Sequence, residues 1–195
     1  MSNHPIQVNS VEDLLLILDR FGIDYGKWNK TPQDLFGEIE NLETTLTSDV
    51  HWGKLTRNVQ SVFLTVISPD GTMQLVEDHQ EYADGKIVVR GLIEIAEKCK
   101  ADENPIAVAY RAIREELLNG ESFDTSSIEL VPIPNPETNK VPRSAYEGLN
   151  TVNNITRFKV QLTDELFKPE GYKEVQPGKK ITYFPWKPIS EIHVD

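Results

Sequence analysis

The sequence has a single cysteine, Cys99, and no apolar run long enough to cross a bilayer. One cysteine excludes an internal disulfide and any zinc cluster built from cysteines. The N-terminus also lacks a basic segment followed by an apolar stretch, which is the pattern of a secretory leader. We therefore expect a cytoplasmic protein that does not span a membrane.

Basic residues are scarce relative to acidic ones, with 20 Lys and Arg against 31 Asp and Glu and a formal net charge of −11. Phosphate backbones and anionic membrane surfaces are recognised by clustered basic side chains, so we expect neither nucleic acid nor membrane as a partner. The four histidines are scattered and show no metal-binding spacing. An acidic protein can still bind a nucleotide through a metal ion and a few local basic residues.

The first 57 residues are predicted to form an α-helical extension. Ser10 is a suitable cap for one helix, and Thr31-Pro32 should begin a second. The apolar stripes of these helices consist of Val11, Leu14, Leu15 and Leu18 in the first, and Leu35, Ile39, Leu42 and Leu46 in the second. A hairpin of two helices cannot bury both stripes alone, so residues 10–46 should pack on the main domain, on a second copy in a homodimer, or on a protein partner.

Residues 58–195 read as a second domain rich in strands. Residues 59–67 and 73–76 should form a hairpin around the turn at 69–71, and another turn at 83–86 precedes a strand at 87–89. Further strands are expected at 128–133, 152–162 and after residue 180. No repeat or low-complexity tract interrupts this pattern.

Residues 103–118, ENPIAVAYRAIREELL, should form a helix with two different faces. One face carries an apolar stripe, consisting of Ile106, Tyr110, Ile113 and Leu117. Glu115 and Glu116 lie away from that stripe, and Arg111 is four residues before Glu115, close enough to hold its carboxylate.

This segment resembles a degenerate form of the Nudix box, the signature of the Nudix hydrolases, over residues 97–119. The signature reads Gly, five residues, Glu, seven residues, then Arg-Glu-U-x-Glu-Glu-x-Gly-U, with U a bulky aliphatic residue. The positions that match it are Glu103, Arg111, Ile113, Glu115 and Glu116. The positions that depart from it include Glu97 and Leu118, where the two glycines belong, and Ala112, where a metal-binding Glu belongs.

The resemblance extends over residues 58–195, because ITYFPWKPISEI at residues 181–192 is similar to the closing strand and first helical turn of Nudix domains. It implies an α/β fold, a Nudix-type α/β/α sandwich with a mixed sheet, here preceded by the N-terminal helical hairpin.

The resemblance also implies a hydrolase that cleaves a nucleoside diphosphate linked to another group. Positions 112, 115 and 116 share one helical face, where carboxylates hold Mg²⁺. Two of the three remain, so Glu115 and Glu116 are the expected ligands of Mg²⁺ (or Mn²⁺), and Arg111 should orient Glu115. Arg111, Glu115 and Glu116 are thus the expected catalytic residues. The general base is left open, with Glu94 and Glu97 as candidates because they precede the helix.

Three basic residues are predicted to contact a nucleotide-derived substrate: Arg90, Lys140 and Arg143. Two alternatives stay open at this point. A catalytically inactive Nudix-fold module could bind a nucleotide or serve protein interaction or regulation, as the loss at Ala112 would suggest. An ordinary amphipathic helix could also present Glu115 and Glu116 to solvent with no ligand at all.

Overall fold

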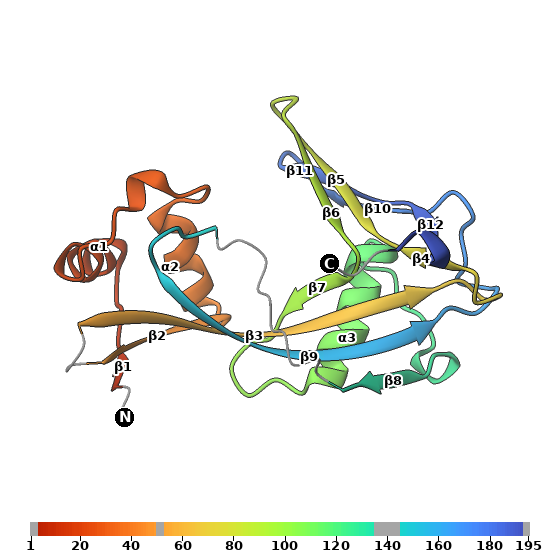
Figure 1. Cartoon of the computed structure of the whole chain (residues 1–195), viewed down its shortest axis with the longest axis horizontal. Coiled ribbons are helices and arrows are strands. Elements are labelled where there is room, and N and C mark those ends of the chain that lie inside the picture. Colours follow the sequence, from red (N-terminus) through yellow and green to blue (C-terminus); the bar gives the residue numbers. More distant parts are fainter. Residues whose placement is uncertain (1–3, 50–52, 135–144, 193–195) are drawn as a thin grey trace. The chain divides into compact units, whose positions relative to one another are not determined.

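The computed structural model describes residues 4–49, 53–134 and 145–192 (Figure 1). The chain forms two compact units, and neither is continuous in sequence. The first unit comprises Met1–Ser61, Lys98–Glu103 and Asn135–Ile155; the second comprises Val62–Glu97, Asn104–Pro134 and Thr156–Asp195. Both contain helices and strands, which confirms the α/β class, whereas the predicted division after residue 57 did not anticipate the two segments that return to the first unit.

The first unit begins with two capped helices. Its elements are β1 (His4–Ile6), α1 (Val11–Arg20), the 3₁₀ turn η1 (Tyr25–Lys27), α2 (Pro32–Glu40), β2 (Thr44–Asp49) and the start of β3 (Lys54–Ile67). The Ser10 side chain accepts a bond from the Asp13 N–H at the start of α1, and Thr31 and Asp34 form a reciprocal capping box at the start of α2. These caps are the ones that the sequence predicts.

The predicted hairpin of two long helices is not confirmed, because α2 ends at Glu40. Leu42 has a φ of 61°, which breaks the helix, and its side chain is exposed. The following segment pairs with β3 in antiparallel register from Thr44 opposite Val59 onward, and Leu46 is buried from this strand. The threonine-rich sequence TTLTSD favours a strand, and the ladder with β3 satisfies its backbone.

Leu14 and Leu18 of α1 and Leu35 of α2 are buried within the first unit. Its core consists of Leu14, Leu18, Leu35, Leu46, Leu55, Tyr146 and Leu149. The Trp28 ring packs edge-on against Tyr146, with ring centroids 4.8 Å apart, and its N–H donates to the Glu147 carbonyl. The short returning segment around Tyr146 therefore completes the core that the helices begin.

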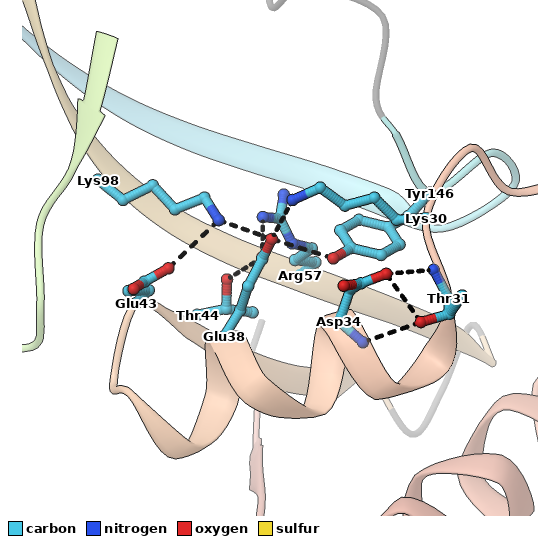
Figure 2. A network of polar contacts seen from close by, with 9 residues as sticks. All are labelled: Lys30, Thr31, Asp34, Glu38, Glu43, Thr44, Arg57, Lys98 and Tyr146. Carbon is cyan, nitrogen blue, oxygen red and sulfur yellow. Dashed lines mark hydrogen bonds and ion pairs between the residues drawn. The ribbon is translucent and has the colours of Figure 1, made fainter. Parts of the chain in front are cut away.

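A buried carboxylate, Glu38, joins the segments of the first unit (Figure 2). Its oxygens lie 2.6 Å from Arg57 Nη2, 2.6 Å from Lys98 Nζ and 2.9 Å from Lys30 Nζ. The hydroxyls of Thr44 and Tyr146 also donate to it. The partners come from the loop before α2, from β2, from β3 and from both returning segments, so one side chain links these segments to α2.

The second unit contains most of the strands. They are the end of β3, β4 (Met73–Leu75), β5 (Glu77–Tyr82), β6 (Ile87–Leu92), β7 (Ile95–Lys98), β8 (Leu130–Ile133), β9 (Asn150–Gln161), β10 (Tyr172–Gln176), β11 (Lys180–Phe184) and β12 (Trp186–Pro188). The helical elements are α3 (Pro105–Ala112), a π-helical turn η2 (Ile113–Leu117) and the 3₁₀ turns η3 (Thr125–Ser127) and η4 (Ile189–Glu191). The predicted hairpins and the closing strand with its helical turn are present.

Four strands of this unit form an antiparallel sheet in the order β10-β11-β5-β6. In another sheet, β12 pairs with β4, β4 with the end of β3, and β8 with β9. The core of the unit includes Val62, Leu64, Leu75, Val108, Ala109, Ile113, Leu117, Val160 and Phe184. Within the described residues, α3 is the one α-helix of this unit. The three-layered Nudix-type sandwich therefore stays a prediction. No helix in the described part of the chain is long and apolar enough to cross a membrane.

Candidate functional site

The helix that carries the predicted motif changes its winding at the motif itself. Asn104 caps α3 by accepting from the Ile106 N–H at 2.9 Å, and Pro105 occupies the first turn. From Ile113 to Leu117 the helix is π-helical. A π-helical turn inserts extra backbone and alters the directions of the side chains that follow, and such turns occur frequently at functional sites.

The two motif glutamates have different surroundings. Glu115 is exposed and forms an ion pair with Arg114 at 3.2 Å, while the half-buried Glu116 lines a cavity. Arg111 forms an ion pair with Glu97, at 3.2 Å. Glu115 does not line the cavity. The predicted roles of Arg111 as the residue that orients Glu115, and of Glu115 and Glu116 as metal ligands, stay predictions.

The cavity at Glu116 has a volume of about 140 Å³ and lies within the second unit. It is lined by Glu77 and Gln80 of β5, Arg90 of β6, Ile95 and Ala96 of β7, Glu116, Glu174 and Gln176 of β10, and Lys180 and Thr182 of β11. One face of the four-stranded sheet thus supplies most of the wall, since alternate residues of a strand point to the same side.

Hydrogen bonds inside the cavity hold two of its carboxylates. The Gln80 amide donates to Glu77 at 2.9 Å, and Arg90 Nε lies 3.6 Å from the same carboxylate. The Thr182 hydroxyl donates to Glu174 at 3.1 Å. Fixed side chains of this kind form a preorganised polar surface.

Glu116 is the most perturbed acid of the cavity. Burial raises its pKa to about 8, and the negative charges of Glu174, Glu97 and Glu77 add to the effect against the opposing charge of Lys180. Burial likewise raises the pKa of Glu77 and lowers the pKa of Lys180. The cavity therefore concentrates more negative charge than its own basic groups balance, and a bound cation would relieve that excess.

The oxygen atoms that line the cavity suit a divalent cation that keeps part of its water shell. Carboxylate, amide and hydroxyl oxygens suit Mg²⁺ or Mn²⁺, which retain waters and take phosphate oxygens as further ligands. Within the described residues, no three Asp, Glu, His or Cys side chains already stand as a complete metal-binding group. Glu116 with one neighbouring carboxylate and several waters could hold such an ion, with a diphosphate completing its coordination.

Ala112 has no ligand atom, and its side chain is fully buried and does not line the cavity. The carboxylates that accompany Glu116 instead come from β5 and β10.

No family model matches the sequence, and no curated protein matches it either. The chain is similar to a solved structure from a structural and functional study of MutT from the psychrophilic fish pathogen Aliivibrio salmonicida and the mesophile Vibrio cholerae. The similarity covers 69% of this chain and 82% of the other, with 13% identity and a TM-score of 0.34. At that score and identity, it is too small to support a fold or a function for this chain.

The structure brings together some of the predicted site residues. Arg90 and Glu116 lie in one cavity, Arg111 and Glu115 lie outside its lining, and Lys140 and Arg143 fall outside the described residues. The sequence reasoning missed Glu174 and Lys180. The alternation of polar residues along KEVQ and KITYF marks one polar face in each strand, which is the signal that could have identified them.

Proposed function

We propose that this protein hydrolyses a nucleoside diphosphate linked to another group, with Mg²⁺ or Mn²⁺ as cofactor. The observation that carries the proposal is the position of Glu116. This residue matches the signature by spacing, and it lies in a cavity that is also lined by Glu77, Glu174, Arg90 and Lys180.

The groups of the cavity suit a diphosphate. Glu116, once deprotonated, would bind the metal ion together with Glu77 or Glu174, and Arg90 and Lys180 would approach the phosphate oxygens. A bound Mg²⁺ supplies a Lewis acid that polarises the phosphoryl group and lowers the pKa of a coordinated water. Gln80 and Thr182 would keep the two flanking carboxylates oriented.

Paired substitutions at the two motif glutamates test this function. Glu116→Gln keeps the size of the side chain but removes the charge in the cavity, so we expect metal-dependent hydrolysis to fall by at least about 100-fold. Glu115→Gln is the matched control, and we expect it to alter the rate less than about threefold because an exposed ion pair contributes little. The assay measures products from nucleotide sugars, dinucleoside polyphosphates, ADP-ribose and nucleoside triphosphates with and without Mg²⁺ or Mn²⁺.

The opposite ranking, with Glu115→Gln inactive and Glu116→Gln active, would contradict the assignment of the site to the cavity. If no metal-dependent hydrolysis of any compound occurs in the wild-type protein, the hydrolase proposal fails.

A second candidate function is a nucleotide-binding module that does not hydrolyse its ligand. The specific observation in its favour is that two of the three carboxylate positions of the signature do not reach the cavity, since Ala112 is buried and Glu115 faces solvent. Saturable binding of one of the same nucleotides, lost in Glu116→Gln and without any product in the wild type, would establish this function in place of the enzyme.

A further inference from the structure

Asn119 connects the end of the motif helix to β10, the strand that brings Glu174 to the cavity. Its side-chain N–H donates to the Lys173 carbonyl at 2.9 Å, and its side-chain oxygen accepts from the Val175 N–H at 3.0 Å. These two bonds lie on either side of Glu174 in the chain, and Glu174 lines the cavity. One side chain therefore holds the backbone before and after a cavity carboxylate.

The backbone of Glu174 is held from its other side by β11. In the antiparallel register Glu174 lies opposite Thr182. Because the backbone groups of successive residues point to alternate sides of a strand, and both neighbours of Glu174 bond to Asn119, Glu174 directs its own N–H and C=O towards β11. The Thr182 hydroxyl also donates to the Glu174 carboxylate at 3.1 Å. Asn119 and β11 thus fix this part of β10 from opposite sides.

Asn119 is itself fixed to the helical turn that carries Glu116. It lies three residues after Glu116, and the adjacent Leu118 is buried. The Gly120 N–H donates to the Arg114 carbonyl at 2.8 Å, which closes the backbone around Asn119. Asn119 has a φ of 49°, a left-handed conformation that asparagine adopts more readily than most residues. The bonds to β10 therefore begin from a fixed point at the end of the motif helix.

We propose that Asn119 is a positioning residue, which sets Glu174 relative to Glu116 so that the two carboxylates hold one divalent cation. This inference rests on the proposed function, and it names Glu174 rather than Glu77 as the second protein ligand. Glu77 already has a cationic neighbour, because Arg90 Nε lies 3.6 Å from its carboxylate. Glu174 also repels the charge of Glu116 more than any other carboxylate does, which raises the pKa of Glu116.

An asparagine suits this role because its amide carries a donor and an acceptor on one planar group. The Lys173 carbonyl needs a donor and the Val175 N–H needs an acceptor, and both lie on the same side of β10. A carboxylate at position 119 would offer acceptors alone. Groups that orient a metal ligand from outside the coordination sphere typically change metal affinity by about 10- to 100-fold when they are removed.

Isothermal titration of the full chain with Mg²⁺ tests this role. Asn119→Gly removes the amide and keeps the left-handed backbone, which glycine adopts readily. We expect it to raise the Mg²⁺ dissociation constant by about 10- to 100-fold. Glu174→Gln should raise the constant at least as much, because it removes the ligand itself. Asn150→Gly is the matched control: it removes an asparagine bond to Thr56 in the first unit and should leave the constant unaltered.

Amide hydrogen exchange without metal separates positioning from a loss of structure. In Asn119→Gly the Val175 amide should exchange rapidly, because its acceptor is gone, while the Glu174 amide should stay protected by β11. Rapid exchange of both amides would show that Asn119 keeps β10 in the sheet rather than setting the position of Glu174, and that result would overturn the proposal.

The titrations also separate this inference from the function on which it rests. A wild-type protein that binds no Mg²⁺ contradicts both. If the wild type binds Mg²⁺ and Asn119→Gly binds it equally well, the cation site stands and the positioning role of Asn119 is wrong. Wild-type affinity in Glu174→Gln also overturns the inference, because the ion would then be held without the carboxylate that Asn119 positions.

Discussion

Glu38→Ala is expected to destabilise the first unit by about 3–5 kcal/mol, which is the typical cost of removing one partner from a buried ion pair. The variant leaves Arg57 in the protein interior, with 8% of its surface exposed and no carboxylate beside it. Tyr146 and Thr44 lose a hydrogen-bond acceptor at the same time. Chemical denaturation of the wild-type and variant proteins measures the change in the free energy of unfolding.

Two controls separate the buried charge from other effects. Glu40→Ala removes an exposed glutamate from the last turn of α2 and should change the free energy of unfolding by less than about 0.5 kcal/mol. The double variant Glu38→Met with Arg57→Met removes both charges, so it should be more stable than Glu38→Ala. A Glu38→Ala protein as stable as the wild type would show that the network contributes nothing to the fold.

The ion pairs of Glu38 also determine how stability should depend on pH. Burial disfavours the charge of Glu38, but Lys98, Arg57 and Lys30 outweigh that effect and hold its pKa well below the usual range. A carboxyl with a depressed pKa in the folded state contributes stability that is fully present above its unfolded value, which is 4.5. That contribution decreases as the pH falls below 4.5, so the difference between the wild type and Glu38→Ala should shrink in acid.

Glu116 is expected to have the opposite effect. Its pKa is raised to about 8 from an unfolded value of 4.5, so between these values the native protein holds a proton that the unfolded chain has lost. Stability without metal should therefore decrease as the pH increases through this window. Glu116→Gln cannot ionise, and above pH 8 we expect it to exceed the wild type by on the order of 2 kcal/mol, since one pKa unit corresponds to about 1.4 kcal/mol and water in the cavity reduces the effect.

Thermal and denaturant unfolding at several pH values with a chelator present measures this difference. Glu115→Gln serves as the control, because the exposed Glu115 lies outside the cavity and its removal should leave the pH dependence of the wild type unchanged. If the stability of the wild type and of Glu116→Gln changed with pH in the same way, the raised pKa of Glu116 would be contradicted.

Helix ends and turns could be predicted from the sequence where one or two residues determine the local structure. Gly22 ends α1 with a φ of 66°, and Thr31 with Pro32 begins α2. The turn at residues 83–86 is also present, with a φ of 82° at Gly85 and the Asp84 side chain accepting from the Lys86 N–H. Each of these features depends on backbone conformations that few residues adopt.

The end of α2 could not be predicted because two interpretations fitted the same residues. Leu35, Ile39, Leu42 and Leu46 have helical spacing. Instead of continuing the helix, the residues from Thr44 onward pair with β3, beginning with Thr44 opposite Val59. That pairing depends on β3, which lies outside the segment with helical spacing. Tertiary contacts of this kind override local periodicity.

The candidate site could be predicted only in part, because some of its residues are brought together by tertiary contacts. The motif spacing pointed to Glu116, and the structure places that residue in a polar cavity. The spacing did not predict that Ile113–Leu117 would be π-helical. Nor could it reveal Glu174, which reaches the cavity through the register of β10 with β11.

Proton release on metal binding tests the central claim, that Glu116 is the centre of a cation site. The pKa of Glu116, raised to about 8 by burial, favours the protonated carboxyl at pH 7, and a metal ligand must be deprotonated, so we expect Mg²⁺ binding to release close to one proton per ion. Isothermal titration of Mg²⁺ at pH 7 in buffers of different ionisation enthalpy counts these protons. We expect this release in the wild type and in Glu115→Gln, and its loss in Glu116→Gln. Mg²⁺ binding with no proton release, or with the same release in Glu116→Gln, would contradict it.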